Sequence, residues 1–128
     1  MAGLDVTPGV PSGSQIIQAY GEGRFRIGGV VHEGSIIVRP LATRLWPARG
    51  PHEIVADQLL ALLDGGQGIE IVVIGCGKRF TAPPPDLRPL LRESGIGVEW
   101  MDTGAACRTF NVLVIEGRPV VAALIAVD

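Results

Sequence analysis

The most constraining feature of this chain is an almost unbroken apolar run, residues 69–74, which ends in Gly75-Cys76-Gly77. A strand that is apolar at successive positions is stable where both faces of its sheet are covered, as in parallel sheets flanked by helices. Two further strands are predicted after it, at 96–101 and 120–127, and a helical pattern precedes each of them. The second half of the chain therefore predicts a mostly parallel sheet that is covered on both faces.

Three helices are predicted around these strands, because apolar residues recur at helical spacing and turn or capping residues bound each segment. Pro51 suits the first turn of a helix that ends before Asp64-Gly65-Gly66, since the N–H that proline lacks has no helical partner in that turn. Asp102-Thr103 is a favourable pair for capping the last helix. We expect the helices at 51–63, 86–95 and 103–116.

The first half of the chain predicts short antiparallel strands. In Arg24–Ile27, polar and apolar residues alternate at the two-residue period of a strand, and Gly28-Gly29 ends the pattern. Residues 40–50 are expected to form a longer connection that carries Trp46. Trp46 is expected to pack in the core, although an exposed Trp46 would suit an interface anchor. The strands of this half are expected at 16–20, 24–27, 30–31 and 35–39.

Composition narrows the class of protein. Of 128 residues, 47% are hydrophobic and 19% are charged, which is typical of a globular chain. We expect a flexible arm at 1–14 and a single α/β domain at 15–128. The chain has 11 basic and 13 acidic residues and no basic stripe, so nucleic-acid binding is not expected. The longest apolar run, at 120–127, is far shorter than the ~20 residues that cross a bilayer, and no secretory signal is recognisable. We expect a cytoplasmic protein that is not an integral membrane protein.

Polar residues and glycines gather where two of the predicted strands end. Ligands of open parallel sheets bind outside the carboxyl ends of the strands, and a helix N-terminus there attracts anions. If the two strands are neighbours, the loops that follow them open on one crevice, which predicts a site for an anion or a partner. The candidate site residues are Gly75, Cys76, Gly77, Lys78, Asp102, Thr103, Gly104, Arg108 and Asn111.

The chemistry of this edge does not indicate catalysis. The segment Gly75–Lys78 lacks the spacing and the following Ser or Thr of a phosphate-binding Walker loop, and it does not open a helix directly. Glycines at strand ends also serve as simple turn residues, and Asp102 also serves as a simple cap. Cys76 and Cys107 have no histidine nearby in the sequence and form no Cys-x-x-Cys motif, so buried free thiols are expected. We expect no catalytic residue, no metal and no cofactor.

Several motifs of the chain resemble a known family. They are Phe25 and Gly29 with the following hairpin His32-Glu33-Gly34-Ser35, Ile74-Gly75-Cys76-Gly77-Lys78, Pro83-Pro84-Pro85, Gly95-Ile96-Gly97-Val98-Glu99, the stretch from Met101 to Asn111, and Glu116-Gly117-Arg118. Together they are similar to the domain-of-unknown-function family that includes mitochondrial complex I assembly factor 3 and the adipogenesis-associated domain protein. The similarity covers residues 16–127. Cys76 departs from the family, where a small residue such as Thr is expected.

The resemblance implies a three-layer α/β fold with a central, mixed, mostly parallel five-stranded sheet, flanking helices and an added small antiparallel β layer. It implies that one strand of the central sheet runs antiparallel to the others. It further implies a non-enzymatic interaction or assembly factor, with an unknown protein partner linked to assembly of a membrane complex. The alternative is a small-molecule or anion-binding protein, or an enzyme, that uses the crevice at the carboxyl edge of the sheet.

Overall fold

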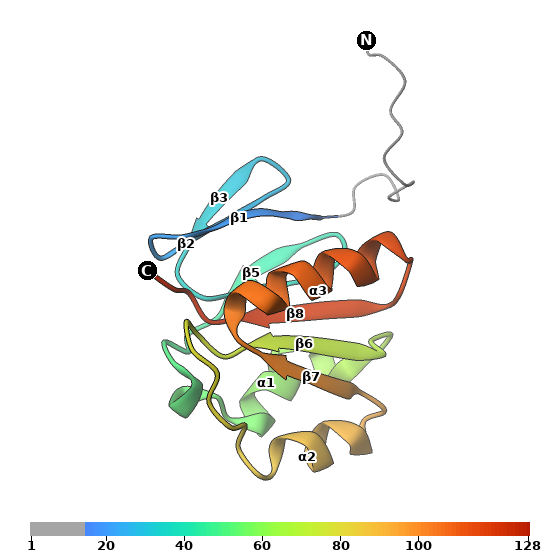
Figure 1. The fold of residues 1–128 in the computed structure, drawn as a ribbon. Helices are drawn as coiled ribbons and strands as arrows, with labels where there is room; N and C mark the ends of the chain where they lie inside the picture. Colours follow the sequence, from blue (N-terminus) through green and yellow to red (C-terminus); the bar gives the residue numbers. More distant parts are fainter. Residues whose placement is uncertain (1–14) are drawn as a thin grey trace.

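The computed structural model describes residues 15–128, so the arm expected at 1–14 lies outside the described residues. The described chain forms a five-stranded mixed sheet, a separate three-stranded antiparallel sheet and three α-helices (Figure 1). The expected fold class is confirmed. The strands are β1 (Ile17–Gly21), β2 (Arg24–Ile27), β3 (Val30–Glu33), β4 (Ile36–Val38), β5 (Thr43–Leu45), β6 (Ile71–Gly75), β7 (Gly97–Met101) and β8 (Val120–Leu124). The helices are α1 (Ala56–Leu62), α2 (Leu87–Glu93) and α3 (Thr103–Ile115).

The three-stranded sheet consists of two hairpins in the order β1-β2-β3. Gly28 and Gly29 connect β2 to β3 at φ 55° and 83°, a left-handed backbone that glycine adopts without steric cost. Phe25 and Ile27 of β2 are buried, whereas Arg26 between them is exposed. The alternation of β2 therefore fixes which face of the small sheet meets the rest of the protein.

The five-stranded sheet has the order β5-β4-β8-β6-β7. Strands β7, β6 and β8 run parallel to one another, as the helical crossovers between them require. Strand β4 is antiparallel to both of its neighbours, β8 and β5. The single antiparallel strand expected in the central sheet is therefore β4.

Successive residues of the central strands supply two separate cores. In β6, Val72 and Ile74 pack on one face of the sheet with α1 and α2, while Val73 packs on the other face with α3 and the small sheet. Strand β8 divides in the same way, with Ala123 on the first face and Ala122 on the second. Figure 1 shows these elements around the central sheet, whose one face packs with α1 and α2 and whose other face packs with α3 and the small sheet β1–β3. The apolar run that predicted a strand covered on both faces is explained by these two cores.

Two local predictions were wrong. The helix expected at 51–63 is a 3-10 turn at Pro51–Glu53 followed, after a break, by α1. Ile54 and Val55 in the break have extended backbones, and this conformation buries Ile54 in the core below the sheet. The connection expected at 40–50 contains β5, which pairs with β4 through Val38↔Thr43. A three-residue edge strand is too short to show a two-residue period, so the pattern did not reveal it.

Candidate functional site

The two loops predicted to carry the site lie side by side, because β6 and β7 are parallel neighbours. Backbone hydrogen bonds join the loops: the N–H of Cys76 donates to the carbonyl of Met101 at 2.8 Å, and the N–H of Thr103 donates to the carbonyl of Gly77 at 2.9 Å. The N–H of Ile125, just after β8, donates to the carbonyl of Gly75 at 2.9 Å. The predicted meeting of the loops therefore occurs as direct contact.

Gly75 permits this close approach. A Cβ atom at position 75 would lie 2.8 Å from the Cα of Thr103 and 3.2 Å from the Cβ of Ala106. Separations of this size do not leave room for a side chain, so the start of α3 packs on bare backbone at the end of β6. The space between the two loops is therefore filled by the protein itself.

Thr103 is completely buried at this contact, and its hydroxyl joins three segments. The oxygen accepts a hydrogen bond from the N–H of Gly77 at 3.0 Å and donates one to the carbonyl of Ile125 at 2.8 Å. Asp102 caps α3, because its Oδ1 accepts the N–H of Ala105 at 2.9 Å. Both polar side chains satisfy backbone groups, as buried or terminal groups must.

Both cysteines are buried free thiols. The thiol of Cys76 donates to the carbonyl of Arg79, with 3.5 Å between sulfur and oxygen. Burial raises the pKa of the Cys107 thiol to about 12, against a smaller opposite effect of the adjacent Arg108. Because the thiolate is the nucleophilic form of cysteine, this environment holds Cys107 in its unreactive form at neutral pH.

Arg108 and Asn111 lie on the other side of the contact between Gly75 and Thr103, beside β1. They line a hollow of about 500 Å³ together with Ile17, Tyr20 and Cys107. Asn111 bonds the backbone of Ile17 twice: Oδ1 accepts the N–H and Nδ2 donates to the carbonyl, each at 2.9 Å. The amide of Asn111 thus attaches β1 to α3. The start of α3 is also covered, because Tyr20 packs against Gly104.

Lys78 lies in a different hollow, of about 280 Å³, with Cys76 and Gly77 in its wall. Arg79, the neighbour of Lys78 in the sequence, lines this hollow as well, and so does Arg49, a cation that sequence reasoning missed. The structure therefore brings the predicted glycines, cysteine and Thr103 together, but it places Lys78 and Arg108 in separate hollows. Arg49 is 29 residues from Lys78 in the sequence, and no local pattern could have paired them.

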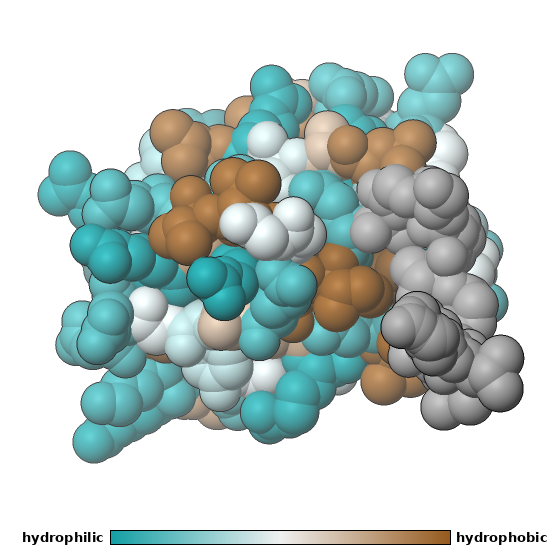
Figure 2. Space-filling view, turned by 90° about the horizontal axis from the view of Figure 1, so that it is seen from above, coloured by the Kyte–Doolittle hydropathy of each residue, from teal (hydrophilic) through white to brown (hydrophobic). Residues whose placement is uncertain are grey.

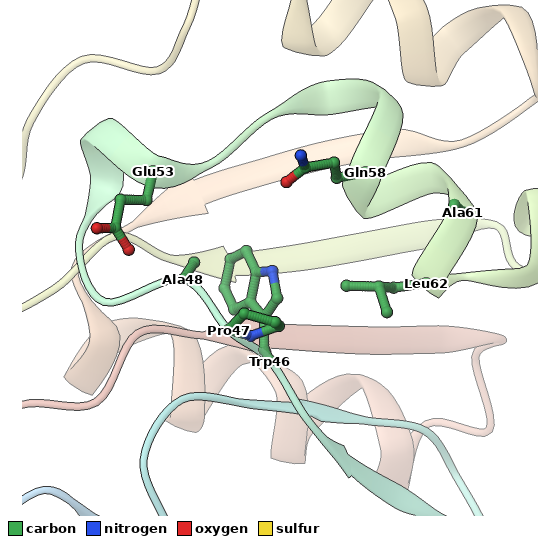
Figure 3. Close-up of a pocket in the computed structure, with 7 residues that line it drawn as sticks. All are labelled: Trp46, Pro47, Ala48, Glu53, Gln58, Ala61 and Leu62. Atoms are coloured by element: carbon green, nitrogen blue, oxygen red, sulfur yellow. The ribbon is translucent and has the colours of Figure 1, made fainter.

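A third hollow, of about 310 Å³, is largely apolar and lies between α1 and the segment that follows β5. In Figure 3 the indole of Trp46 lies at its centre, with Leu62 pointing toward the ring from α1 and Glu53 at the far side. Trp46 is only 6% exposed. It therefore forms part of the wall and is not the protruding anchor that an exposed tryptophan would have provided.

Within residues 15–128, no three His, Cys, Asp or Glu side chains come together in an arrangement that could hold a metal ion. In the same part of the chain, no helix has the length and apolar character needed to cross a membrane.

Comparison with known proteins identifies the family to which this architecture belongs. A family model described as "Protein of unknown function (DUF498/DUF598)" matches residues 17–125, from β1 to the end of β8. The chain belongs to the DUF498/DUF598 family. The matched region contains both sheets and all three helices. The family resemblance drawn from the sequence motifs is confirmed.

Relatives of this DUF498/DUF598 chain include bacterial and animal proteins. It is 34% identical to an uncharacterized protein from Rhodobacter capsulatus, over 89% of this chain and 86% of that protein. It is 36% identical to NADH dehydrogenase [ubiquinone] 1 alpha subcomplex assembly factor 3 from Xenopus tropicalis, over 85% of this chain and 60% of the assembly factor. The chain thus spans about three fifths of the length of that relative.

Solved structures share the fold of this DUF498/DUF598 chain. The crystal structure of an outer membrane protein from Bartonella henselae has a TM-score of 0.82 and 40% sequence identity, and the match covers 91% of this chain and 98% of that one. A solution structure from Bordetella pertussis, described as a Mth938-like domain, has a TM-score of 0.78 and 28% identity, covering 94% and 91%. The three-layer architecture is therefore shared along almost the whole described chain.

Proposed function

We propose that this DUF498/DUF598 chain is an assembly-type factor for a respiratory NADH dehydrogenase, acting through protein contacts and without catalysis. One observation carries the proposal: the chain is 36% identical, over 85% of its length, to a protein named as an assembly factor of that enzyme. In this proposal the chain works in the cytoplasm and binds a partner that belongs to, or helps to build, the membrane complex.

The use of polar groups at the carboxyl edge supports a role without catalysis. Thr103, Asp102 and Asn111 each bond backbone groups of the protein. A general base or nucleophile needs a free polar atom within reach of a substrate. The thiol of Cys107 is buried and protonated at neutral pH, so it is a poor nucleophile.

Exposed apolar side chains support a role in protein contacts. Val30 and Val31 of β3 and Leu45 of β5 are each more than half exposed. Figure 2 views the molecule from the side of the small sheet and shows hydrophobic side chains in patches among hydrophilic ones. Apolar groups of this kind at a sheet edge are suited to contacts with another chain.

The test is deletion of the gene in its native host, followed by separation of the membrane complexes on a native gel and staining for NADH dehydrogenase activity. We expect the assembled complex to decrease and a plasmid copy of the gene to restore it. The tagged chain should co-purify with subunits of that complex, identified by mass spectrometry. Unchanged complex in the deletion strain would exclude the assembly role.

A second candidate function is binding of a small anionic molecule. The observation that favours it is the hollow at Lys78, where Arg49 and Arg79 add two more positive charges. An enzyme or a small-molecule-binding protein would use such charges to hold a carboxylate or phosphate. Titration with citrate separates this candidate from docking of a protein.

A further inference from the structure

Three cations line one hollow, and none of them forms an ion pair with another described residue. Arg49, Lys78 and Arg79 line it, and Asp128 is the one acidic residue among its lining residues. The ion pairs formed between the described residues, with nitrogen to oxygen distances up to 4.0 Å, involve none of the three cations. The hollow therefore has a positive surplus in a chain whose formal net charge is −2.

The loop that carries two of these cations is attached to the core at both ends of a short segment. The thiol of Cys76 donates to the carbonyl of Arg79, and the indole N–H of Trp100 donates to the carbonyl of Thr81 at 2.6 Å. Between these attachments Phe80 is 63% exposed, although it is a large aromatic residue. A loop held in this way loses less conformational entropy when a partner binds its side chains.

The third cation comes from the segment before the 3-10 turn. The N–H of Arg49 donates to Oε1 of Glu53 at 2.7 Å, which fixes the backbone of this second segment at the hollow. Gly50 and Pro51 continue that wall. Charges thus approach the hollow from two segments whose backbones are separately held.

We propose that this cationic hollow, defined by Arg49, Lys78 and Arg79, docks an acidic segment of a protein partner, with an apolar side chain of that segment against Phe80. The inference rests on the proposed function and names the chemistry of its partner. Charge complementarity selects carboxylates. Phe80 lies outside the lining of the hollow but follows Arg79 directly in the chain, and exposed aromatic residues are enriched at protein interfaces. A small anion would satisfy the charges but would leave Phe80 without a contact.

The test uses the purified full-length chain and the synthetic peptide Ac-Glu-Glu-Leu-Glu-Glu-NH2, followed by NMR at low salt. We expect saturable shifts at the backbone amides of Lys78 to Thr81 and at the indole N–H of Trp100, with a Kd at or below about 1 mM. The Trp46→Phe variant assigns the indole signals. Added salt should weaken the binding, because the attraction is between exposed charges.

Matched variants locate the binding. The double variant Lys78→Ala/Arg79→Ala should lower the affinity for the acidic peptide about tenfold, since removal of two charge contacts costs about that factor. Arg26→Ala/Arg92→Ala removes the same charge from exposed positions outside the hollow and should leave the affinity unchanged. Phe80→Ala should lower the affinity for the leucine-containing peptide more than it lowers the affinity for Ac-Glu-Glu-Ala-Glu-Glu-NH2. Equal weakening by the two double variants would overturn the proposal, and so would failure to saturate.

Two control ligands decide what kind of ligand the hollow takes. The neutral peptide Ac-Gln-Gln-Leu-Gln-Gln-NH2 should not bind, and binding of it would refute charge recognition. Citrate should bind more weakly than the acidic peptide. If citrate binds as tightly, the hollow is a small-anion site and the docking of a protein segment is refuted. These measurements use the purified chain, so they fail or succeed independently of the deletion experiment, which alone tests the assembly role.

Discussion

Cys107 shows at the scale of one residue how burial controls chemistry. Its thiol lies in the core between α3 and the small sheet, and desolvation of the thiolate raises the pKa from 9.0 to about 12. The positive charge of Arg108 acts in the opposite direction but does not compensate. Cys107 is the fifth residue of α3, beyond the first turn in which a helix dipole acts on a thiol, and burial has the largest effect on its pKa.

This shift predicts a pH dependence of stability. Because the folded pKa is above the unfolded value, the stabilising contribution is complete below about pH 9 and is lost as the pH rises toward 12. We expect the difference in free energy of unfolding between the native chain and Cys107→Ala to be constant from pH 6 to 8 and to decrease above pH 9. Urea unfolding at a series of pH values measures it.

An independent readout is thiol modification in the Cys76→Ala background. The folded protein should react with iodoacetamide at pH 8 far more slowly than the same protein in urea. Rapid alkylation of the folded protein at pH 8 would contradict a buried, protonated Cys107.

At the scale of elements, the attachment of β1 to α3 depends on one side chain. Asn111 makes both hydrogen bonds to Ile17, at the position where the small sheet meets the helix. Because the two residues are 94 positions apart, this contact joins two segments that are far apart in the sequence. An asparagine that appeared from the sequence to belong to a ligand site thus has a structural role at one end of β1.

We predict that Asn111→Ala destabilises the protein by about 2 kcal/mol, since it leaves the N–H and the carbonyl of Ile17 without these partners. Hydrogen exchange in β1 should accelerate more than exchange in β6. Asn111→Asp retains the acceptor and loses the donor. Its stability should therefore lie between that of the native chain and that of Asn111→Ala. Unchanged exchange in β1 would show that other contacts hold this strand.

At the scale of the whole molecule, two cores share one sheet. Strands β4, β6 and β8 contribute residues to both cores, so loss of either core removes support from the other. We therefore propose that residues 15–128 unfold as a single domain. The separate small sheet packs on the second core through Phe25 and Ile27, and we propose that it unfolds with the same unit.

Cooperative unfolding provides the test. The fluorescence of Trp46 and Trp100 reports on the core below the sheet, and NMR amide signals of β2 report on the core above it. We expect the two probes to have the same urea midpoint. Loss of the β2 signals at a lower urea concentration would show that the small sheet is a separate folding unit.

The sequence by itself determined the architecture of the second half. A continuous apolar run reports burial on both faces, and periodicity together with capping residues locates helices, because these patterns depend on neighbours a few residues away. The positions of β6, β7, α2 and α3 were predicted within a few residues for this reason. The pattern also predicted the short strands β1 to β4 of the first half, whereas their division into a small β layer and one antiparallel strand of the central sheet came from the family resemblance.

Only the tertiary structure decided which polar residues share a surface. The sequence placed Lys78 and Arg108 at the same edge, but packing of Thr103 on Gly75 fills the space between the loops and separates the two cations. It also brings Arg49 to Lys78 from a different segment. Periodicity reports whether a side chain is buried and not which distant residue it meets, because that choice depends on how whole layers pack together.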